Sequence, residues 1–257
     1  MLRKNRLIIS ALIMPILLLS ACNLPDRQIP QTQAPTTTTV VMPEPSPTPV
    51  QLCRNQYFPS SIGDTWQYSG SNSTIGDYNR TDTVTNTNID SFSVKTSLSN
   101  VTYTLQYNCS SAGLIATDPV TQYAGALLNS PDIPVTVKLS SNTGITLPAN
   151  VAPGDTWQQT ADFEASAQDV NLSGGLIFDY TAIGYENVTV PFGSFNALRI
   201  DTTIRVEVSA LRVTAGTYKT STWLVPNVGV VKSEGASHVS GIDFTDNMQL
   251  TSFSSVP

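Results

Sequence analysis

The sequence has few of the side chains that catalysis and metal binding require. It contains one histidine, His238, and three cysteines in 257 residues. No Cys/His grouping has the spacing of a zinc site, and neither a Gly-x-Ser-x-Gly turn nor a glycine-rich phosphate-binding motif occurs. We therefore predict that the protein is not an enzyme and that it has no catalytic residue, metal or cofactor. An extracytoplasmic hydrolase that uses His238 with Asp243 or Asp246 is kept as an alternative hypothesis.

One stretch resembles a calcium-binding loop in part. Residues 77–82 read Asp-Tyr-Asn-Arg-Thr-Asp, which begins with the spacing of an EF-hand loop. The glycine expected at the sixth position is absent, and Asn88 stands where the bidentate glutamate is needed. We expect a solvated loop here and no metal.

Charge is also sparse, and basic charge is the scarcer sign. Only 12% of the residues are charged, and residues 51–257 contain nine Lys and Arg against 17 Asp and Glu, a net charge of −8. Nucleic acids and anionic membrane surfaces both attract basic faces. We therefore exclude nucleic acid as a partner.

A long apolar run occurs once, at the N-terminus. Three basic residues within residues 1–6 precede a run from Leu7 to Leu19 that only Ser10 and Pro15 interrupt. This run is shorter than the roughly 20 residues of a membrane-spanning helix and suits a signal peptide. It ends in Leu-Ser-Ala-Cys, which resembles the lipobox of bacterial lipoproteins. The resemblance implies cleavage after residue 21 and attachment of lipid to Cys22.

Residues 22–50 differ in composition from the rest of the chain. After Cys22 the segment reads NLPDRQIPQTQAPTTTTVVMPEPSPTPV, in which Pro and Thr dominate and no apolar periodicity appears. Such a segment has too little apolar surface to fold by itself. At about 3.1 Å per residue, an extended Pro-rich linker of this length reaches roughly 80 Å. We predict a disordered tether between a lipidated Cys22 and a domain that comprises residues 51–257.

Assigning Cys22 to lipid leaves Cys53 and Cys109 in the exported domain. Disulfides form and persist outside the cytoplasm, so a bond between these two cysteines is expected. On the chain-entropy model it would stabilise the domain by about 4 kcal/mol. Two free buried thiols are the alternative.

The domain has the periodicity of β-strands. Residues 198–209 place apolar or Thr side chains at every second position and charged or polar side chains between them. A period of two with one wet face is typical of antiparallel sheets. The same alternation recurs in four further segments, whose inward residues are Phe92, Val94, Thr96, Leu98; Val101, Tyr103, Leu105, Tyr107; Ile133, Val135, Val137, Leu139; and Ile242, Phe244, Met248, Leu250, with Asp246 as an interruption.

Helical periodicity is almost absent. Only residues 121–129 and 161–169 have patterns that allow short helical turns. We therefore predict an all-β fold, either an antiparallel sandwich or a strongly curved, barrel-like sheet.

Gly-Asp-Thr-Trp-Gln occurs twice, at residues 63–67 and 154–158. Gly-Asp suits a turn, and Thr-Trp suits the start of a strand whose indole points inward. A Ser-Phe strand and a Gly-Leu or Gly-Val strand follow each copy in the same order. We infer two related β units of about 90 residues, within residues 57–140 and 146–253, that share one core.

The three tryptophans of the domain could serve as a stacking platform or as part of the core. Trp66, Trp157 and Trp223 all lie in strand context beside apolar residues. Core packing is the better explanation, and we predict these residues to be core anchors.

Three segments resemble recurrent pieces of functionally uncharacterised, secreted, β-rich bacterial lipoprotein domains. They are YFPSSIGDTWQYSG at 57–70, VTVPFGSFNALRI at 188–200 and TWLVPNVGVVKSEG at 222–235. The group brings no catalytic residues. A more distant likeness is to LolA/LolB-type carriers, which are curved sheets that enclose an apolar cavity.

The sequence therefore predicts a lipoprotein held on the extracytoplasmic face of a cell membrane by its lipid anchor. Its domain is expected to be a non-catalytic binding or envelope-structural module. The partner class stays open among an envelope component, a protein, a glycan and a hydrophobic small molecule. A carrier of a hydrophobic ligand in a β cavity is the main alternative.

Overall fold

The structure is a computed structural model that describes residues 52–99, 101–120, 136–167, 170–208, 213–239 and 242–256. The predicted signal peptide, Cys22 and the predicted tether lie outside the described residues. So do the possible helical turn at 121–129 and the first two residues of the alternating run at Ile133 and Val135. Within the described ranges, no helix has the length and apolarity that crossing a membrane requires.

The described residues of the domain form 13 strands in a single antiparallel sheet. The strands are β1 (Thr65–Asn72), β2 (Gly76–Thr87), β3 (Ser91–Leu98), β4 (Val101–Ser110), β5 (Gly113–Ala116), β6 (Thr136–Gly144), β7 (Leu147–Pro148), β8 (Thr156–Ala167), β9 (Val170–Val190), β10 (Gly193–Val208), β11 (Val213–Val225), β12 (Gly229–Val239) and β13 (Ile242–Ser254). The all-β, antiparallel prediction is confirmed.

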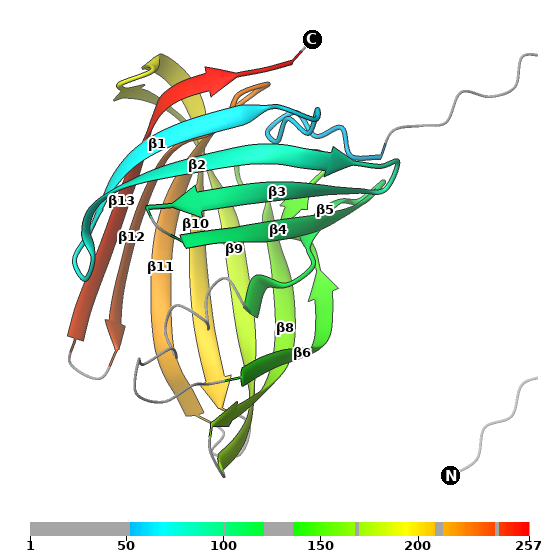
Figure 1. Ribbon diagram of the computed structural model, residues 1–257, viewed down its shortest axis with the longest axis vertical. Helices are drawn as coiled ribbons and strands as arrows, with labels where there is room; N and C mark the ends of the chain where they lie inside the picture. The colour runs from blue at the N-terminus through cyan, green and yellow to red at the C-terminus, as the bar shows by residue number, and fades with distance from the viewer. Residues whose placement is uncertain are drawn as a thin grey trace, which may run out of the picture. The chain divides into compact units, whose positions relative to one another are not determined.

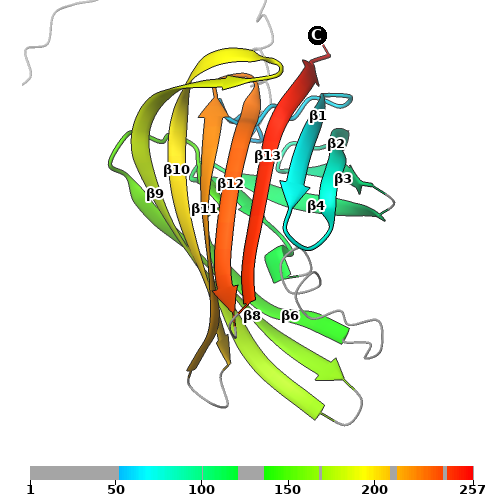
Figure 2. The same cartoon turned by 90° about the vertical axis from the view of Figure 1, so that its left-hand side faces the viewer.

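The strands are arranged in the order β6-β8-β9-β10-β11-β12-β13-β1-β2-β3-β4-β5-β7. Apart from the step between β13 and β1, and the places of β6 and β7, neighbours in the sheet are neighbours in the chain. The sheet curves so strongly that β1–β4 run across the face of the long strands (Figures 1 and 2). Its end strands β6 and β7 do not pair with each other, so the sheet is open. Of the two predicted architectures, the structure therefore has the curved single sheet.

Alternation along each strand separates an inner face from an outer face. In β10, Leu198, Ile200 and Ile204 are buried, whereas Arg199 and Asp201 between them are partly exposed. Phe92, Val94 and Thr96 of β3 are buried in the same way. The alternation read from these segments predicts the inner face correctly because side chains of a strand point to opposite faces in turn.

Two local predictions were wrong. Residues 161–167 continue strand β8 and are not helical: Ala161, Phe163 and Ala165 are buried, whereas the polar residues between them are exposed. A period of two is therefore present, but alanines weaken its signal. Residues 77–82 form the first half of β2 and not a solvated loop, with Tyr78 and Asp82 buried.

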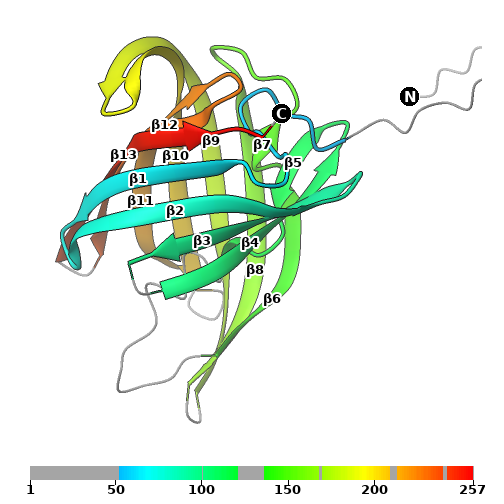
Figure 3. The ribbon, with the colours of Figure 1, turned by 45° about the horizontal axis from the view of Figure 1, so that its top comes forward.

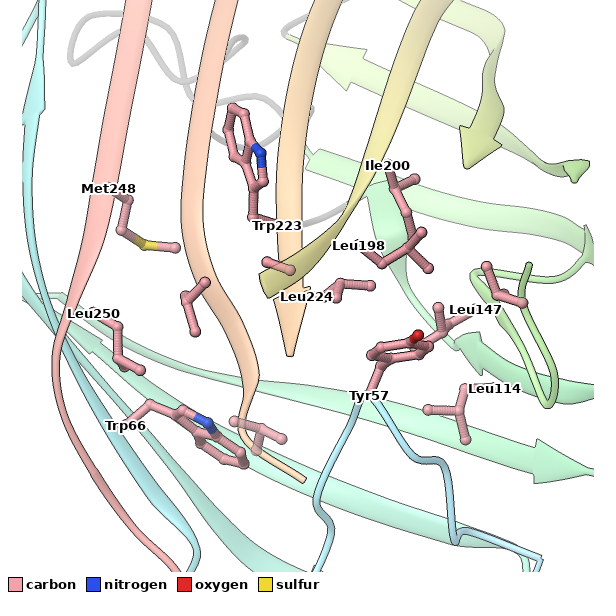
Figure 4. Packing of buried hydrophobic residues seen from close by; sticks show 14 of the residues in the cluster. Tyr57, Trp66, Leu114, Leu147, Leu198, Ile200, Trp223, Leu224, Met248 and Leu250 are labelled. Carbon is pink, nitrogen blue, oxygen red and sulfur yellow. The ribbon is translucent and has the colours of Figure 1, made fainter. Parts of the chain in front are cut away.

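The inner face holds two hydrophobic clusters. The larger combines residues of β1–β5 with residues of β9–β13, and Figure 4 shows members such as Trp66, Leu198 and Leu250. The smaller combines Val120, which follows β5, with residues of β8–β10: Ala161, Phe163, Ala165, Leu176, Phe178 and Ile204. Because the sheet curves, strands far apart in the chain bury their inner faces against each other, which stabilises the domain.

The two Gly-Asp-Thr-Trp-Gln copies form matching turns. Gly63 and Gly154 adopt positive φ values of 96° and 92°, a conformation that favours glycine. Asp64 accepts a hydrogen bond from the Ser61 N–H at 2.9 Å, and Asp155 accepts one from the Ala152 N–H at 2.8 Å. Strands β1 and β8 begin directly after these turns. The repeat as a whole stays a prediction.

Polar side chains join the two ends of the open sheet. Gln159 of β8 is buried, and its amide donates to the Ala116 carbonyl of β5 at 3.1 Å. Asn142 of β6 donates to the same carbonyl at 2.8 Å. Thr146 donates to Gln159 at 2.5 Å and accepts from the Ala116 N–H at 2.7 Å. These bonds hold β5 beside β6 and β8 although the strands do not pair.

Cys53 and Cys109 form a disulfide bond, with their Cα atoms 5.1 Å apart. The bond ties the first described loop to the end of β4. Both cysteines are buried within the larger cluster. The loop that precedes β1 is thereby fixed against the sheet.

Candidate functional site

A polar network surrounds Asp246 on the inner face, where β13 lies beside the β1–β2 hairpin. The Tyr78 hydroxyl donates to the Asp246 carboxylate at 3.1 Å, and the Asn72 amide donates to it at 3.1 Å. The ring of Tyr78 lies over Gly70, where any Cβ atom would clash with it. Burial, and then the charge of Asp246, raise the pKa of Tyr78. The tyrosine therefore stays protonated and remains a donor.

A second inner network surrounds Asp82. The Arg80 guanidinium contacts the Asp82 carboxylate at 2.8 Å, and the Thr96 hydroxyl donates to it at 2.7 Å. Burial lowers the pKa of Arg80, but the charges of Asp82 and Tyr103 outweigh it and raise the pKa overall. Burial also raises the pKa of the neighbouring Tyr68. The Arg80 charge therefore persists over the ordinary pH range.

These inner groups satisfy one another. Among the side chains that the structure describes, no buried nitrogen or oxygen atom lacks a hydrogen-bond partner. A ligand that reached them would have to replace existing charge-assisted bonds, each worth about 1.5–3 kcal/mol. The inner networks are therefore part of the scaffold.

The tryptophans belong to the scaffold as well. Trp66 and Trp223 are buried and Trp157 is half-buried. Each indole N–H donates a hydrogen bond: Trp66 to the Val228 carbonyl, Trp157 to the Thr146 carbonyl and Trp223 to the Glu186 carboxylate. None of the three offers an open stacking surface.

Trp223 differs from the other two because charged side chains cover it. Strand register places Arg199 and Lys232 on either side of it, on the outer face. The Lys232 ammonium lies 4.6 Å from the ring centroid and the Arg199 guanidinium 5.7 Å. Arg199 also forms ion pairs with Asp201 and Glu186, so its charge is already compensated within the protein.

A pocket of about 320 Å³ lies where the domain begins. Its walls come from the loop before β1, from the β11–β12 turn and from the end of β13. The lining residues are Arg54, Asn55, Gln56, Phe58, Pro59, Ser60, Ser61, Asp64, Asn227 and Ser255. We take this pocket as the candidate functional site.

Hydrogen bonds fix the frame of the pocket. Asp64 is 1% exposed, and its carboxylate accepts from the Ser61 N–H, the Ser255 hydroxyl and the Val256 N–H at 2.9–3.2 Å. Asn55 donates to the Pro148 carbonyl at 2.9 Å. These bonds and the nearby disulfide hold three distant segments of the chain together, so the pocket is preformed.

Three side chains of the pocket remain available for a ligand. Arg54, Gln56 and Asn227 are exposed, and no hydrogen bond or ion pair joins their side chains to another residue of the described ranges. They offer one guanidinium and two carboxamides beside the half-buried ring of Phe58. Such a set suits a polar ligand with hydroxyl, amide or anionic groups.

The residues of the alternative hydrolase site lie on the neighbouring strands β12 and β13, and that site stays a hypothesis. His238 of β12 lies opposite Asp243 of β13 in strand register, and Asp246 lies opposite Gly235. Asp246 is occupied by Tyr78 and Asn72 as described above. Within the described ranges, no three Asp, Glu, His or Cys residues are grouped in a way that could hold a metal ion.

Sequence reasoning missed the pocket. Its residues come from positions 54–64, 227 and 255. Several of them lie in the recurrent segments 57–70 and 222–235, but no pattern in the sequence indicates that these segments meet. One local signal was present, the polar run Cys-Arg-Asn-Gln at 53–56 beside a predicted disulfide. Only the folded chain brings Asn227 and Ser255 to that run.

Two solved structures share this fold. One is a protein from Bacteroides fragilis that is predicted to be exported and is described as having a YmcC-like fold; it is 14% identical, with a TM-score of 0.50, and the match covers 79% of this chain and all of the other. The second is a predicted lipoprotein from Parabacteroides distasonis, which is 15% identical, with a TM-score of 0.50 and coverage of 78% and 99%. At such identities, the likeness shows a common fold.

The sequence itself also matches a family. Residues 125–238 match the model of the DUF3108-like family, which corresponds to less than half of the chain. A comparison with curated proteins finds no match. The matched segment extends through the long strands β8–β11 and most of β12, and it excludes most of the pocket.

Proposed function

We propose that this protein is a lipoprotein, anchored through Cys22 on the extracytoplasmic face of a bacterial membrane, whose β domain is a non-catalytic binding module. The observation that supports the anchor is the order of charge, apolar run, small residues and Cys22 at the N-terminus. The disulfide bond of the domain suits an exported protein. The solved structures with the same fold are predicted to be an exported protein and a lipoprotein.

The pocket supports the binding half of the proposal. It combines a preformed frame with three polar side chains that form no hydrogen bond or ion pair with another described residue. Its ligand would be a polar component of the cell envelope, of which a glycan is the best match to one guanidinium, two carboxamides and an aromatic ring. The pocket gives no support to the hydrophobic carrier, since that function needs an apolar cavity.

The anchor is tested in cells that express the full-length chain. Wild type should incorporate labelled palmitate and fractionate with membranes, whereas Cys22→Ser should lose the label and stay uncleaved. The control is Cys53→Ser with Cys109→Ser, which removes the other cysteines and should keep the label. Label that survives in Cys22→Ser contradicts the anchor.

The pocket is tested by binding of oligosaccharides prepared from the bacterial envelope. Gln56→Ala and Asn227→Ala should each weaken binding by about three- to tenfold, the effect of one lost hydrogen bond. Asn79→Ala is the control, because Asn79 is exposed on β2 and lies outside the pocket. Equal binding by all four proteins contradicts the assignment of the pocket.

A further inference from the structure

Among the residues that the structure describes, half of strand β4 has no paired strand on one side and forms an edge of the sheet. Strand β3 pairs with β4 along its length, from Leu98 opposite Val101 to Ser91 opposite Asn108. Strand β5 pairs only with residues 107–110. Figures 1 and 3 show the beginning of β4 as a border of the curved sheet. We call residues 101–106 the β4 edge.

The unpaired backbone groups of the β4 edge can be identified. The Gln106 carbonyl accepts from the Thr117 N–H at 2.8 Å on the side of β5. Because backbone groups alternate in direction along a strand, the N–H and C=O groups of Thr102 and Thr104 point to the same side. Both residues are exposed, and within the described residues no hydrogen bond reaches these groups.

The β4 edge carries none of the residues that usually protect a strand edge. Its sequence Val-Thr-Tyr-Thr-Leu-Gln contains no charge, proline or glycine. In natural proteins, charged residues, prolines or bulges keep an edge strand from pairing with another strand. Lys138 is such a charged residue on the opposite border strand β6. Val101 is 60% exposed, and Tyr103 and Leu105 are half-buried beside it. Such an edge is built to accept another strand.

We propose that the β4 edge pairs with the β4 edge of a second copy of this chain, in antiparallel orientation around Tyr103. This register places Thr102 of each copy opposite Thr104 of the other, so that both residues exchange N–H···O=C bonds and their four groups per chain are satisfied. Val101 and Leu105 come into contact across the axis. The contact pairs the β4 edge of one copy with that of the other, so no β4 edge remains for a third copy and the dimer does not grow.

Charge and tethering favour a second copy of this chain as the partner of the β4 edge. The domain is acidic, with a net charge of −8 over residues 51–257, and because the β4 edge itself carries no charge, repulsion between copies opposes contact least at this edge. The proposed lipid anchor would also confine copies to one membrane on long tethers, which raises their effective concentration. The proposal rests on the proposed anchoring for this second argument alone.

The test uses full-length Tyr103→Cys in membranes under mild oxidation. In the proposed register the two copies of residue 103 form a non-hydrogen-bonded pair with Cα atoms about 4.5 Å apart, within the range of a disulfide. A covalent homodimer is expected. Gln67→Cys, exposed on the central strand β1, is the control and should stay monomeric.

A second pair of variants separates strand pairing from chance contact. Adding Thr104→Pro removes an outward N–H without breaking the pairing with β3, and it should abolish the dimer. Adding Thr104→Val keeps the N–H and should preserve it. No dimer from Tyr103→Cys, a dimer that survives Thr104→Pro, or a cross-link to another protein in place of a second copy each overturns the proposal.

The same variants in the unlipidated Cys22→Ser background distinguish this proposal from that of the anchor. If the anchor proposal fails but the edge proposal holds, purified Cys22→Ser/Tyr103→Cys still dimerises as its concentration rises, and Thr104→Pro still prevents it. Absence of the dimer in both backgrounds overturns the edge proposal alone.

Discussion

Asp64 and Asp155 occupy the same place in the two Gly-Asp-Thr-Trp-Gln turns but hold different parts of the structure. Asp64 is buried and accepts hydrogen bonds from the turn and from residues 255 and 256 near the end of the chain. Asp155 is exposed, and its carboxylate accepts a hydrogen bond from the Ala152 N–H within its own turn. The repeated motif therefore specifies the turn, while its surroundings decide how much stability depends on it.

Replacing each aspartate by alanine should show this difference. Asp64→Ala leaves buried donors unsatisfied and should lower the free energy of unfolding by about 2–3 kcal/mol, whereas Asp155→Ala should cost less than about 1 kcal/mol. Urea unfolding of both variants measures the two values. Equal losses would mean that the bonds to residues 255 and 256 contribute nothing.

Strands β2 and β10 each carry an Arg-x-Asp pair, but the two pairs lie on opposite faces of the sheet. Arg80 and Asp82 lie on the inner face, with side chains 21% and 11% exposed. Arg199 and Asp201 lie on the outer face, with side chains 32% and 38% exposed. Spacing in the sequence is identical in the two pairs, but only the inner pair is shielded from water.

The shielding predicts unequal effects of removing the acid. Asp82→Ala leaves the Arg80 charge without compensation inside the sheet and should lower the free energy of unfolding by about 3 kcal/mol. Asp201→Ala should cost less than about 1 kcal/mol, because water screens the outer pair. Thermal and urea unfolding compare the two variants; a larger loss for Asp201→Ala would contradict the assignment of faces.

Strand patterns were read correctly where large apolar side chains alternate with polar ones, as in β10 and β3. They were misread in β8, because Ala161 and Ala165 are small and also favour helices. The stretch 77–82 was misread for a different reason. Its charged residues suggested solvent, but the sheet buries Asp82 by supplying Arg80 and Thr96 as partners.

For the domain as a whole, buried tyrosines link stability to alkaline pH. Burial raises the pKa of Tyr57, Tyr68 and Tyr78 above the ordinary value of 10.0, with help from Tyr185, Asp82 and Asp246 respectively. A folded-state pKa above the unfolded value means that the folded state keeps its proton longer. Stability from these groups is therefore complete below about pH 10 and falls as the pH rises further.

A tyrosinate titration tests this dependence. Of nine tyrosines, Tyr57, Tyr68 and Tyr78 should ionise only as the domain unfolds. Because each of the three tyrosines ionises in the unfolded state first, each should lower the free energy of unfolding by about 1.4 kcal/mol per pH unit above pH 10. Tyr78→Phe should leave one fewer resistant tyrosine. Ionisation of all nine near their ordinary pKa, with the circular dichroism unchanged, would contradict the prediction.

Local pattern was sufficient to predict an all-β antiparallel domain, the inner residues of its strands and the turns at Gly63 and Gly154. These features depend on side-chain alternation and backbone conformation within a few residues, which the sequence states directly. The tertiary structure alone decided that the strands form one curved, open sheet, that Arg54, Asn227 and Ser255 share a pocket, and that half of β4 has no paired strand on one side within the described residues. Each of these depends on which distant strands pair and where the pairing stops, and that is determined by the packing of the whole domain.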